Sequence, residues 1–388
     1  MLPRNIISTA EKYKKLFPVL AVTGPRQSGK TTFLKTYFKN YKYFNLENIE
    51  TYRLFTEDPA AFINSKQAKI IIDEVQRVPE LLSYIQAVVD EQKIMGSYIV
   101  SGSENLLLSA KIAQSLTGRA AYLTLPPLVN SEIAQSKLPL KNLYAKIFTG
   151  GYPAIFDRRL NPTVYYEEYT STYIERDVRQ IKNVSNLRLF RKFVRLLAGR
   201  IAQPFNASSL ANDIGVTSTT IKDWLSILEA TYIIFALEPW HKNIGKQLTK
   251  MPKIYFYDTG LLCYLLDLKN ARELETHYLI GSIFENFIIA DIKKELLNRK
   301  SPDYLYFFRE KNGHEIDLLL KRGQKLIPVE IKKGGTFASD FTKGLKYWNS
   351  LKITAPSSQA AVIYTGHTET QTSTYRLLNW RQATEALL

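Results

Sequence analysis

The sequence predicts an α/β protein with a parallel sheet near the N-terminus, a helical middle segment and a second, smaller α/β unit at the C-terminus. Short apolar runs at residues 19–23, 69–72 and 97–101 alternate with helix-compatible segments, which is typical of buried parallel strands. Residues 129–200 have mostly helical periodicity. Because 388 residues exceed one ordinary hydrophobic core, we expect two or three domains.

The chain is strongly basic, with a net charge of +16. The excess is +7, +5 and +4 in residues 1–150, 151–270 and 271–388, so no segment forms a basic tail. Such a charge favours a polyanionic partner such as DNA, and a generally basic surface is the alternative. Hydrophobic residues make up 45% and charged residues 23% of the chain, as in folded globular proteins.

Three features predict a soluble, cytoplasmic protein without membrane association. Residues 1–15 contain charges and no apolar run of the kind found in a secretory signal peptide. The longest apolar stretch, residues 232–237, is far shorter than the roughly 20 residues that span a bilayer. Cys263 is the single cysteine, which excludes an intramolecular disulfide and a cysteine-based zinc cluster and is expected in a reducing compartment.

A phosphate-binding loop follows the first predicted strand. Residues 24–31 match G-x-x-x-x-G-K-S/T at each fixed position and precede a helix-compatible segment. The glycines let backbone N–H groups surround phosphates at the positive end of the next helix. We therefore expect a P-loop NTPase in which Lys30 reaches the β- and γ-phosphates of ATP and Thr31 ligates Mg²⁺. The expected nucleotide contacts are Gly24, Pro25, Arg26, Gln27, Ser28, Gly29, Lys30, Thr31 and Thr32.

Two acidic residues end the next apolar strand. Asp73 and Glu74 follow the β-branched run at residues 70–72, in the form of a Walker B strand. The carboxyl ends of parallel strands lie at one edge of a sheet, so both side chains should lie near the phosphate loop. Asp73 is expected to hold Mg²⁺, and Glu74 to act as the general base that polarises the attacking water.

The segments after this strand resemble the AAA+ ATPases. The strand at residues 97–101 is followed by Gly102 and Ser103, as at their sensor 1, and Arg119 precedes the strand at 121–125. The resemblance implies a catalytic role for Ser103 and an arginine-finger role for Arg119 in the site of a neighbouring subunit. A homo-oligomer is therefore expected, and a surface arginine is the alternative for Arg119.

Nearly the whole chain resembles the bacterial and archaeal AAA ATPases that carry a C-terminal domain of unknown function. The resemblance rests on TGPRQ at 23–27, IDEVQRVPEL at 72–81, SGS at 101–103, SLTGR at 115–119, GGYP at 150–153 and YIERDV at 173–178. Glu104 departs from this group, which usually has an amide or another neutral residue there. A carboxylate near the γ-phosphate would repel it, so Glu104 either points away or lowers turnover.

The resemblance and the helical pattern imply a core at residues 1–128 and a helical lid at 129–185 that closes over the nucleotide. Arg176 and Arg179 are candidates for a second phosphate sensor in this lid. Surface ion pairs with the acidic residues around them are the alternative.

Residues 186–255 are expected to form a winged helix-turn-helix. The pattern at 208–225 has a small residue in one helix, Gly215 at the turn and apolar anchors in a second helix, and residues 232–237 would supply the wing. DNA would be held mainly through its phosphates, and a protein partner is the alternative. The candidate contacts form one face of an amphipathic helix, joined by one residue of the second helix: Arg188, Arg191, Lys192, Arg195 and Lys222.

Residues 256–388 resemble the PD-(D/E)xK nucleases, which have a restriction-endonuclease-like fold. Asp317 is followed by Glu330-x-Lys332 on an apolar strand, and Glu285 lies on the preceding predicted helix. The three carboxylates could hold a divalent metal ion while Lys332 positions the attacking water. Ile316 replaces the proline that usually precedes the aspartate, and a nuclease-like fold without catalysis is the alternative.

These features together predict an ATPase that couples ATP and Mg²⁺ binding to a DNA-binding or nuclease-like C-terminal half. A nucleotide-gated protein-interaction module is the first alternative. A metal-dependent DNA nuclease is the second.

Overall fold

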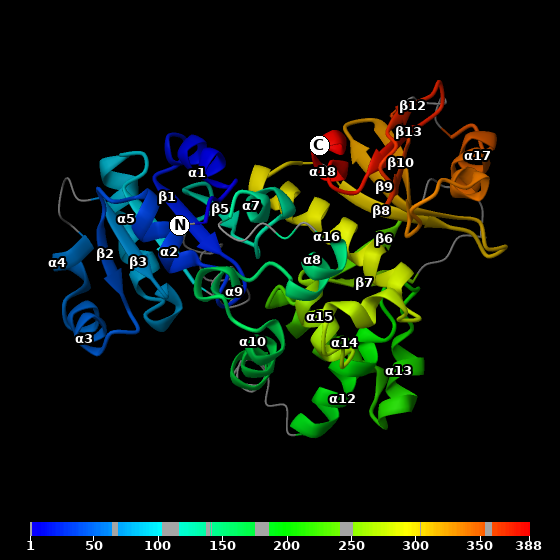
Figure 1. Cartoon of the computed structure of the whole chain (residues 1–388). Coiled ribbons are helices and arrows are strands. Elements are labelled where there is room, and N and C mark those ends of the chain that lie inside the picture. Colours follow the sequence, from blue (N-terminus) through cyan, green and yellow to red (C-terminus); the bar gives the residue numbers. More distant parts are fainter. Residues whose placement is uncertain are drawn as a thin grey trace.

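A computed structural model describes residues 2–63, 69–102, 116–136, 140, 142–174, 186–240, 251–302, 304–353 and 359–388. Figure 1 shows the N-terminal sheet on the left, helices of the middle segment below, and a second sheet at the upper right. Helix α16 (Ile280–Arg299) lies between the two sheets.

Five parallel strands form the N-terminal sheet in the order β2-β3-β4-β1-β5. Alternate residues of β1 pack on opposite faces, because Val19 and Leu20 belong to different hydrophobic clusters. Helices cover both faces, so the predicted α/β fold with a parallel sheet is confirmed. The strands are β1 (Val19–Thr23), β2 (Lys42–Asn45), β3 (Ile70–Asp73), β4 (Tyr98–Ser101) and β5 (Ala120–Thr124), and the helices are α1 (Ile7–Lys14), α2 (Lys30–Tyr37), α3 (Ile49–Glu57), α4 (Pro59–Ile63) and α5 (Leu81–Gln92).

In its described residues up to β6, the middle segment consists of helices joined by short loops, with an isolated β-bridge between Pro204 and Lys253. Asparagine side chains cap several of its helices; Asn186, for example, accepts a hydrogen bond from the backbone N–H of Leu189. The basic helix predicted at 186–200 is observed, with Phe190 and Phe193 buried and the arginines exposed. The helices are α7 (Asn130–Ala134), α8 (Leu143–Thr149), α9 (Pro153–Arg158), α10 (Pro162–Tyr169), the π-helix η2 (Thr170–Ile174), α12 (Leu187–Ala198), α13 (Ala207–Ile214) and α14 (Ser218–Ala230).

The second sheet has eight strands in the order β12-β13-β11-β10-β9-β8-β6-β7. Its centre is the antiparallel pair β9–β10, which carries the predicted Asp317 and Glu330. The strands are β6 (Ile234–Pro239), β7 (Lys253–Phe256), β8 (Tyr304–Arg309), β9 (Glu315–Arg322), β10 (Lys325–Lys332), β11 (Ala361–Tyr364), β12 (Thr370–Gln371) and β13 (Arg376–Asn379), and the α-helices of this region besides α16 are α15 (Thr259–Leu265), α17 (Lys343–Ser350) and α18 (Ala383–Leu387).

The predicted boundary between residues 255 and 256 falls inside this sheet. Strand β6 pairs with β7 on one side and, through Glu238 and Pro239, with β8 on the other. The apolar run at 232–237 therefore contributes a buried strand to the C-terminal sheet instead of standing apart as a wing. Burial of an apolar strand between two neighbours explains why the sheet extends across the predicted boundary.

Helix α16 joins the two sheets through hydrogen bonds near its C-terminal end. Lys294 Nζ donates to the carbonyl of Leu128 at 2.8 Å, and Lys300 Nζ donates to the carbonyl of Tyr122 on β5 at 2.9 Å. The backbone N–H of Asn130 donates to Asp291 at 2.8 Å. Both halves of the chain therefore contact each other directly.

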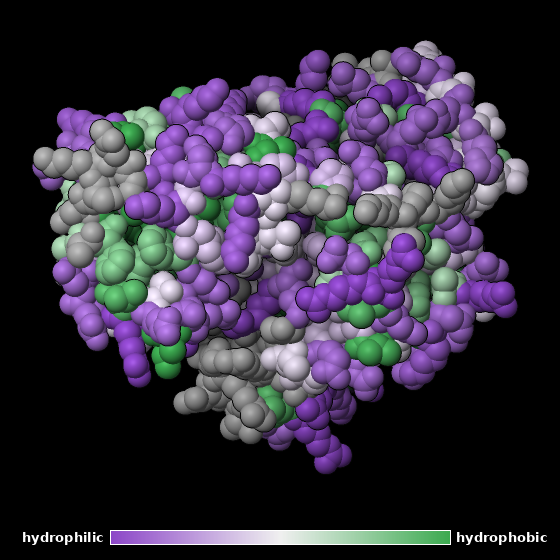
Figure 2. Space-filling model, turned by 60° about the vertical axis from the view of Figure 1, so that its left-hand side comes forward, coloured by the Kyte–Doolittle hydropathy of each residue, from purple (hydrophilic) through white to green (hydrophobic). Residues whose placement is uncertain are grey.

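No helix in the described part of the chain is long and apolar enough to cross a membrane. The face seen in Figure 2 is largely hydrophilic, with a smaller hydrophobic area on its left side. This surface agrees with the large number of charged side chains in the sequence.

Candidate nucleotide site

The phosphate loop connects the end of β1 to the start of α2. Gly24 has φ +143°, and a Cβ there would lie closer than 3.0 Å to the carbonyl oxygen of Leu125. Gly29 has φ +91° and precedes the first residue of α2. The position of Gly24 therefore requires glycine because a Cβ has no space there and because its φ is positive. The position of Gly29 requires glycine because its φ is positive. The loop places the N–H groups of the first turn of α2 toward the space above it.

Lys30 is buried and points back over the loop. Its Nζ donates to the carbonyl oxygens of Gly24 and Pro25, both at 3.0 Å. These carbonyls hold the ammonium group at the centre of the loop, where the β- and γ-phosphates are expected.

Asp73 lies at the carboxyl end of β3 and is 1% exposed. Thr31 Oγ1 donates to its Oδ2 at 2.6 Å, so the two predicted Mg²⁺ ligands are in direct contact. Tyr43 donates to the same oxygen at 2.6 Å, and Ser101 donates to Oδ1. Neither Tyr43 nor Ser101 was predicted as a site residue, because their approach to Asp73 depends on strand order, which no local pattern encodes.

Glu74 has the left-handed conformation, with φ 60° and ψ 44°. Few residues other than glycine adopt this conformation, which turns the carboxylate toward the loop. Gln76 donates a hydrogen bond to Glu74, and burial raises the pKa of this carboxyl while Lys30 opposes the rise. A general base with a raised pKa accepts a proton more readily near neutral pH.

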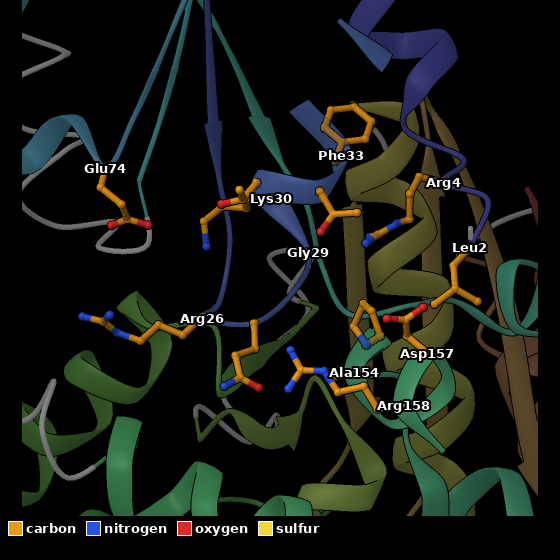
Figure 3. A pocket seen from close by; sticks show the side chains of 14 residues that line it. Leu2, Arg4, Arg26, Gly29, Lys30, Phe33, Glu74, Ala154, Asp157 and Arg158 are labelled. Atoms are coloured by element: carbon orange, nitrogen blue, oxygen red, sulfur yellow. The ribbon is translucent and has the colours of Figure 1, made fainter. Parts of the chain in front are cut away.

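A pocket of about 420 Å³ lies over the loop and is closed on one side by α9 of the middle segment. Figure 3 shows Glu74 on one side of this pocket and Leu2, Arg4 and Asp157 on the other, with Lys30 between them. The predicted residues that line it are Arg26, Gln27, Gly29, Lys30, Thr31, Thr32 and Glu74. Its volume is within the usual range for small-molecule sites.

Two arginines of the pocket were not predicted. Arg4 donates to the carbonyl of Ser28 in the loop at 2.8 Å and forms a buried ion pair with Glu132 of α7 at 3.3 Å. Arg158 lies on α9, five residues after Pro153, the last residue of the GGYP motif. Neither residue belongs to the motif of the phosphate loop, so only the tertiary structure brings them to it.

Arg119 immediately precedes β5. It therefore lies at the edge of the sheet opposite to the edge that carries the phosphate loop. Because β5 is five residues long, these two edges of the sheet are about 15 Å apart. Arg119 is paired with Asp90 on the surface, with 2.7 Å between Nη2 and Oδ2, and this bond lowers the pKa of Asp90. Ser103, Glu104, Arg176 and Arg179 lie outside the described residues, and their predicted roles stay predictions.

The C-terminal half contains a second group of buried charges. Lys332 Nζ is 3.1 Å from Asp317 Oδ2 and 2.5 Å from Glu330 Oε2, so these three predicted residues are brought together. Glu285 is bound instead by Lys253 at 3.0 Å and Tyr255 at 2.6 Å. Within the described ranges, no group of three metal-ligating side chains is positioned to hold a metal ion.

These ion pairs change the acidity of the carboxyls. Burial and the neighbouring Asp317 raise the pKa of Glu330 to about 9. Burial raises the pKa of Glu285 to about 7, although Lys253 opposes the rise. Burial alone would raise the pKa of Asp317 as well, but Lys332 and Lys253 outweigh it and lower this pKa. One carboxyl of the Asp317–Glu330 pair is therefore held protonated.

The predicted DNA contacts lie on the exposed side of α12 and on α14. Arg188, Arg191, Lys192 and Arg195 line a surface pocket of about 580 Å³ between α10, α12 and α15. Lys192 Nζ also donates to the carbonyl of Asp213 at 2.6 Å. Lys222 is exposed on α14. Four cations on one helix therefore face solvent around one depression of the surface.

Comparison with known proteins gives matches over most of the chain. A family model described as "AAA domain" matches residues 16–134, and two domains of unknown function match residues 140–272 and 280–382. A Walker-type ATPase of Pyrococcus abyssi shares 14% identity at a TM-score of 0.46, covering 68% of this chain and 96% of the other. The RuvB Holliday junction branch migration motor of Thermotoga maritima shares 18% identity at a TM-score of 0.29, covering 60% of this chain and 89% of the other.

The curated relatives are uncharacterized proteins. One from Haemophilus influenzae is 24% identical over 361 residues, which is 81% of this chain and 89% of the relative. One from Mycobacterium tuberculosis is 31% identical over 324 residues, which is 82% of this chain and 71% of the relative. The chain therefore belongs to the same family as this mycobacterial protein, and its N-terminal unit is an AAA-type ATPase domain.

Proposed function

We propose that the chain binds ATP with Mg²⁺ at the phosphate loop and hydrolyses it. The observation that carries this proposal is the convergence of Lys30, the Thr31–Asp73 pair and Glu74 on one pocket at the carboxyl edge of the sheet. A hydroxyl and a carboxylate in direct contact are hard oxygen donors of the kind that Mg²⁺ prefers. Bound there, the ion would neutralise charge on the β- and γ-phosphates.

Each residue of the pocket then has a separate task. Lys30 exchanges the carbonyls of Gly24 and Pro25 for phosphate oxygens, and the N–H groups of the loop bind the remaining oxygens. Glu74 orients a water molecule and accepts its proton, which its raised pKa favours. Arg158 and Arg4 line the pocket as cations on the side of α9 and the N-terminal segment.

Steady-state ATP hydrolysis with Mg²⁺ tests this proposal, with Lys30→Ala as the blank. Turnover that is absent from Lys30→Ala supports it. A wild-type protein that neither binds nor hydrolyses ATP would refute it. ATP binding without turnover would refute hydrolysis alone and direct attention to Glu104.

For the C-terminal half, we propose a DNA-binding role controlled by the nucleotide. Helices α13 and α14, joined at Gly215 and preceded by α12, support a helix-turn-helix arrangement, although the strand expected as its wing belongs to the C-terminal sheet. The cations of α12 would contact phosphates, which predicts salt-sensitive binding with little dependence on sequence.

Duplex binding at several salt concentrations tests the DNA proposal. Arg191→Ala combined with Lys192→Ala should weaken binding and reduce the salt dependence. Lys12→Ala combined with Lys15→Ala removes the same charge from exposed positions at α1 and serves as the matched control. Equal affinity of both double variants would favour the alternative, a nucleotide-gated protein-interaction module.

A nuclease-like C-terminal domain is supported by the contact of Lys332 with both Asp317 and Glu330 on β9 and β10. Mg²⁺- or Mn²⁺-dependent DNA cleavage that Asp317→Ala abolishes would establish a third function, a nuclease. The absence of cleavage by the wild-type protein would favour a nuclease-like fold without catalysis.

Assembly into a homo-oligomer is proposed from Arg119, whose distance from the phosphate loop of its own chain leaves it to act on a neighbouring subunit. Arg119→Ala should then remove turnover and leave ATP affinity intact. Full turnover by this variant would refute the arginine-finger role.

A further inference from the structure

Asp73 is surrounded by three hydroxyl groups, and each reaches it from a different element. Its Oδ2 accepts from Thr31 of α2 and from Tyr43 of β2, both at 2.6 Å, and its Oδ1 accepts from Ser101 of β4. Asp73 is almost fully buried, so water does not compete for its oxygens. The three hydroxyl groups therefore fix the orientation of its carboxylate.

The ring of Tyr43 is itself held in place. Strand β2 pairs with β3 so that Tyr43 lies beside Ile71, two residues before Asp73. Lys35 of α2 lies over the ring, with Nζ 4.3 Å from its centroid. Tyr43 therefore connects the helix of the phosphate loop, the strand of Asp73 and the edge strand of the sheet.

The three hydroxyls do not remain equivalent when the site is filled. In the proposed function, Thr31 would hold Mg²⁺ through the same hydroxyl that now donates to Asp73. Tyr43 is then the other described donor on Oδ2. Groups that hydrogen-bond to a metal-binding carboxylate fix its orientation, and their loss typically weakens metal affinity by about 10- to 100-fold.

We propose that Tyr43 is a positioning residue that holds Asp73 in the orientation required for the nucleotide-bound Mg²⁺. The phenol acts through Asp73 and does not touch the nucleotide or the reacting atoms. This inference rests on the proposed function, because it assumes that ATP binds with Mg²⁺ at this site.

The test compares ATP affinity in Mg²⁺ with ATP affinity in EDTA, measured by titration with a fluorescent ATP analogue. The dissociation constant in EDTA divided by that in Mg²⁺ gives the contribution of the ion to ATP affinity. This ratio can be measured without turnover. Tyr43→Phe should reduce this ratio about 10- to 100-fold and leave the affinity in EDTA as in the wild type.

Tyr41→Phe is the matched control, because it removes a phenol oxygen two residues away. The Tyr41 hydroxyl donates to the carbonyl of Gly96 at 2.5 Å, away from the phosphate loop. Tyr41→Phe should retain the wild-type ratio, and thermal unfolding of both variants checks that each is folded.

Each other outcome has a distinct meaning. A wild-type ratio in Tyr43→Phe would overturn the inference while the proposed function stands. Equal weakening in Mg²⁺ and in EDTA would show a general packing role for Tyr43 and would also overturn it. A wild-type protein whose ATP affinity does not depend on Mg²⁺ would refute the Mg²⁺ site of the proposed function, and the inference with it.

Discussion

Gly150 occupies a position at which even one added methyl group has a large predicted effect. It has φ 70° and ψ −159°, a region that is essentially limited to glycine. A Cβ there would lie closer than 3.0 Å to the Tyr166 hydroxyl and to both carboxylate oxygens of Asp258. These atoms form a buried network, in which Asp258 accepts from Tyr166 and from the N–H of Gly151, both at 2.7 Å.

The cost of Gly150→Ala has two parts. The backbone conformation costs about 1–3 kcal/mol for a residue with a Cβ. Separation of Tyr166 from Asp258 removes a hydrogen bond to a buried carboxylate, which costs about 1.5–3 kcal/mol. The free energy of unfolding should therefore fall by about 2.5–6 kcal/mol. Because Gly151 leads into α9, the affinity for ATP should fall as well.

Urea unfolding followed by tryptophan fluorescence measures this loss. Gly313→Ala is the control, since Gly313 has φ +92° and no atom within 4 Å of a built Cβ, so that only the backbone part remains. The two variants should differ by about 2–3 kcal/mol. A loss in Gly150→Ala no larger than that in Gly313→Ala would refute the reasoning from the Asp258 network.

Three further predictions concern buried charges. Glu74→Gln should lower turnover about 10²- to 10⁴-fold and keep ATP affinity. Because burial raises the pKa of Glu74, the turnover of the wild type should fall as the pH drops through that raised pKa. A wild-type rate that does not depend on pH would contradict this. Folded Glu330 keeps a proton up to about pH 9 that the unfolded chain releases near 4.5, so stability should decrease over this interval. Glu330→Gln should reduce the decrease in urea midpoints, most clearly above about pH 7, where Glu285 no longer contributes. Lys253→Met should cost about 3–5 kcal/mol because it leaves Glu285 and Glu315 without their buried cation. Lys269→Met, at an exposed pair with Asp267, should leave the urea midpoint close to that of the wild type.

The parallel sheet was predictable because its strands are buried on both faces and appear as continuous apolar runs. The phosphate loop was predictable because its glycines and Lys30 lie within eight consecutive residues. The contacts of Tyr43 and Ser101 with Asp73 were not predictable. These residues come from separate strands and meet Asp73 only through the strand order β2-β3-β4. Arg4 and Arg158 line the pocket from segments outside the sheet, and only the tertiary structure brings these segments to the loop.

In the C-terminal half, the resemblance to the PD-(D/E)xK nucleases implied that Asp317 and Lys332 belong to one site, and the structure brings these residues together. The ion pair of Glu285 with Lys253 was not predictable, because Lys253 lies in β7, ahead of α16 in the chain, and no sequence pattern indicated that the two residues would meet.

The continuity of β6 with β8 limits how the chain can be divided. A fragment that begins at residue 256 would leave the backbone groups of β8 uncovered at Tyr306 and Phe307, where β6 now pairs. Unprotected strand margins of this kind recruit other chains and lead to aggregation. The helices around α14 and the sheet around β9 therefore share a strand pairing, so a cut at residue 256 would remove a neighbour of β8 as well as the helices.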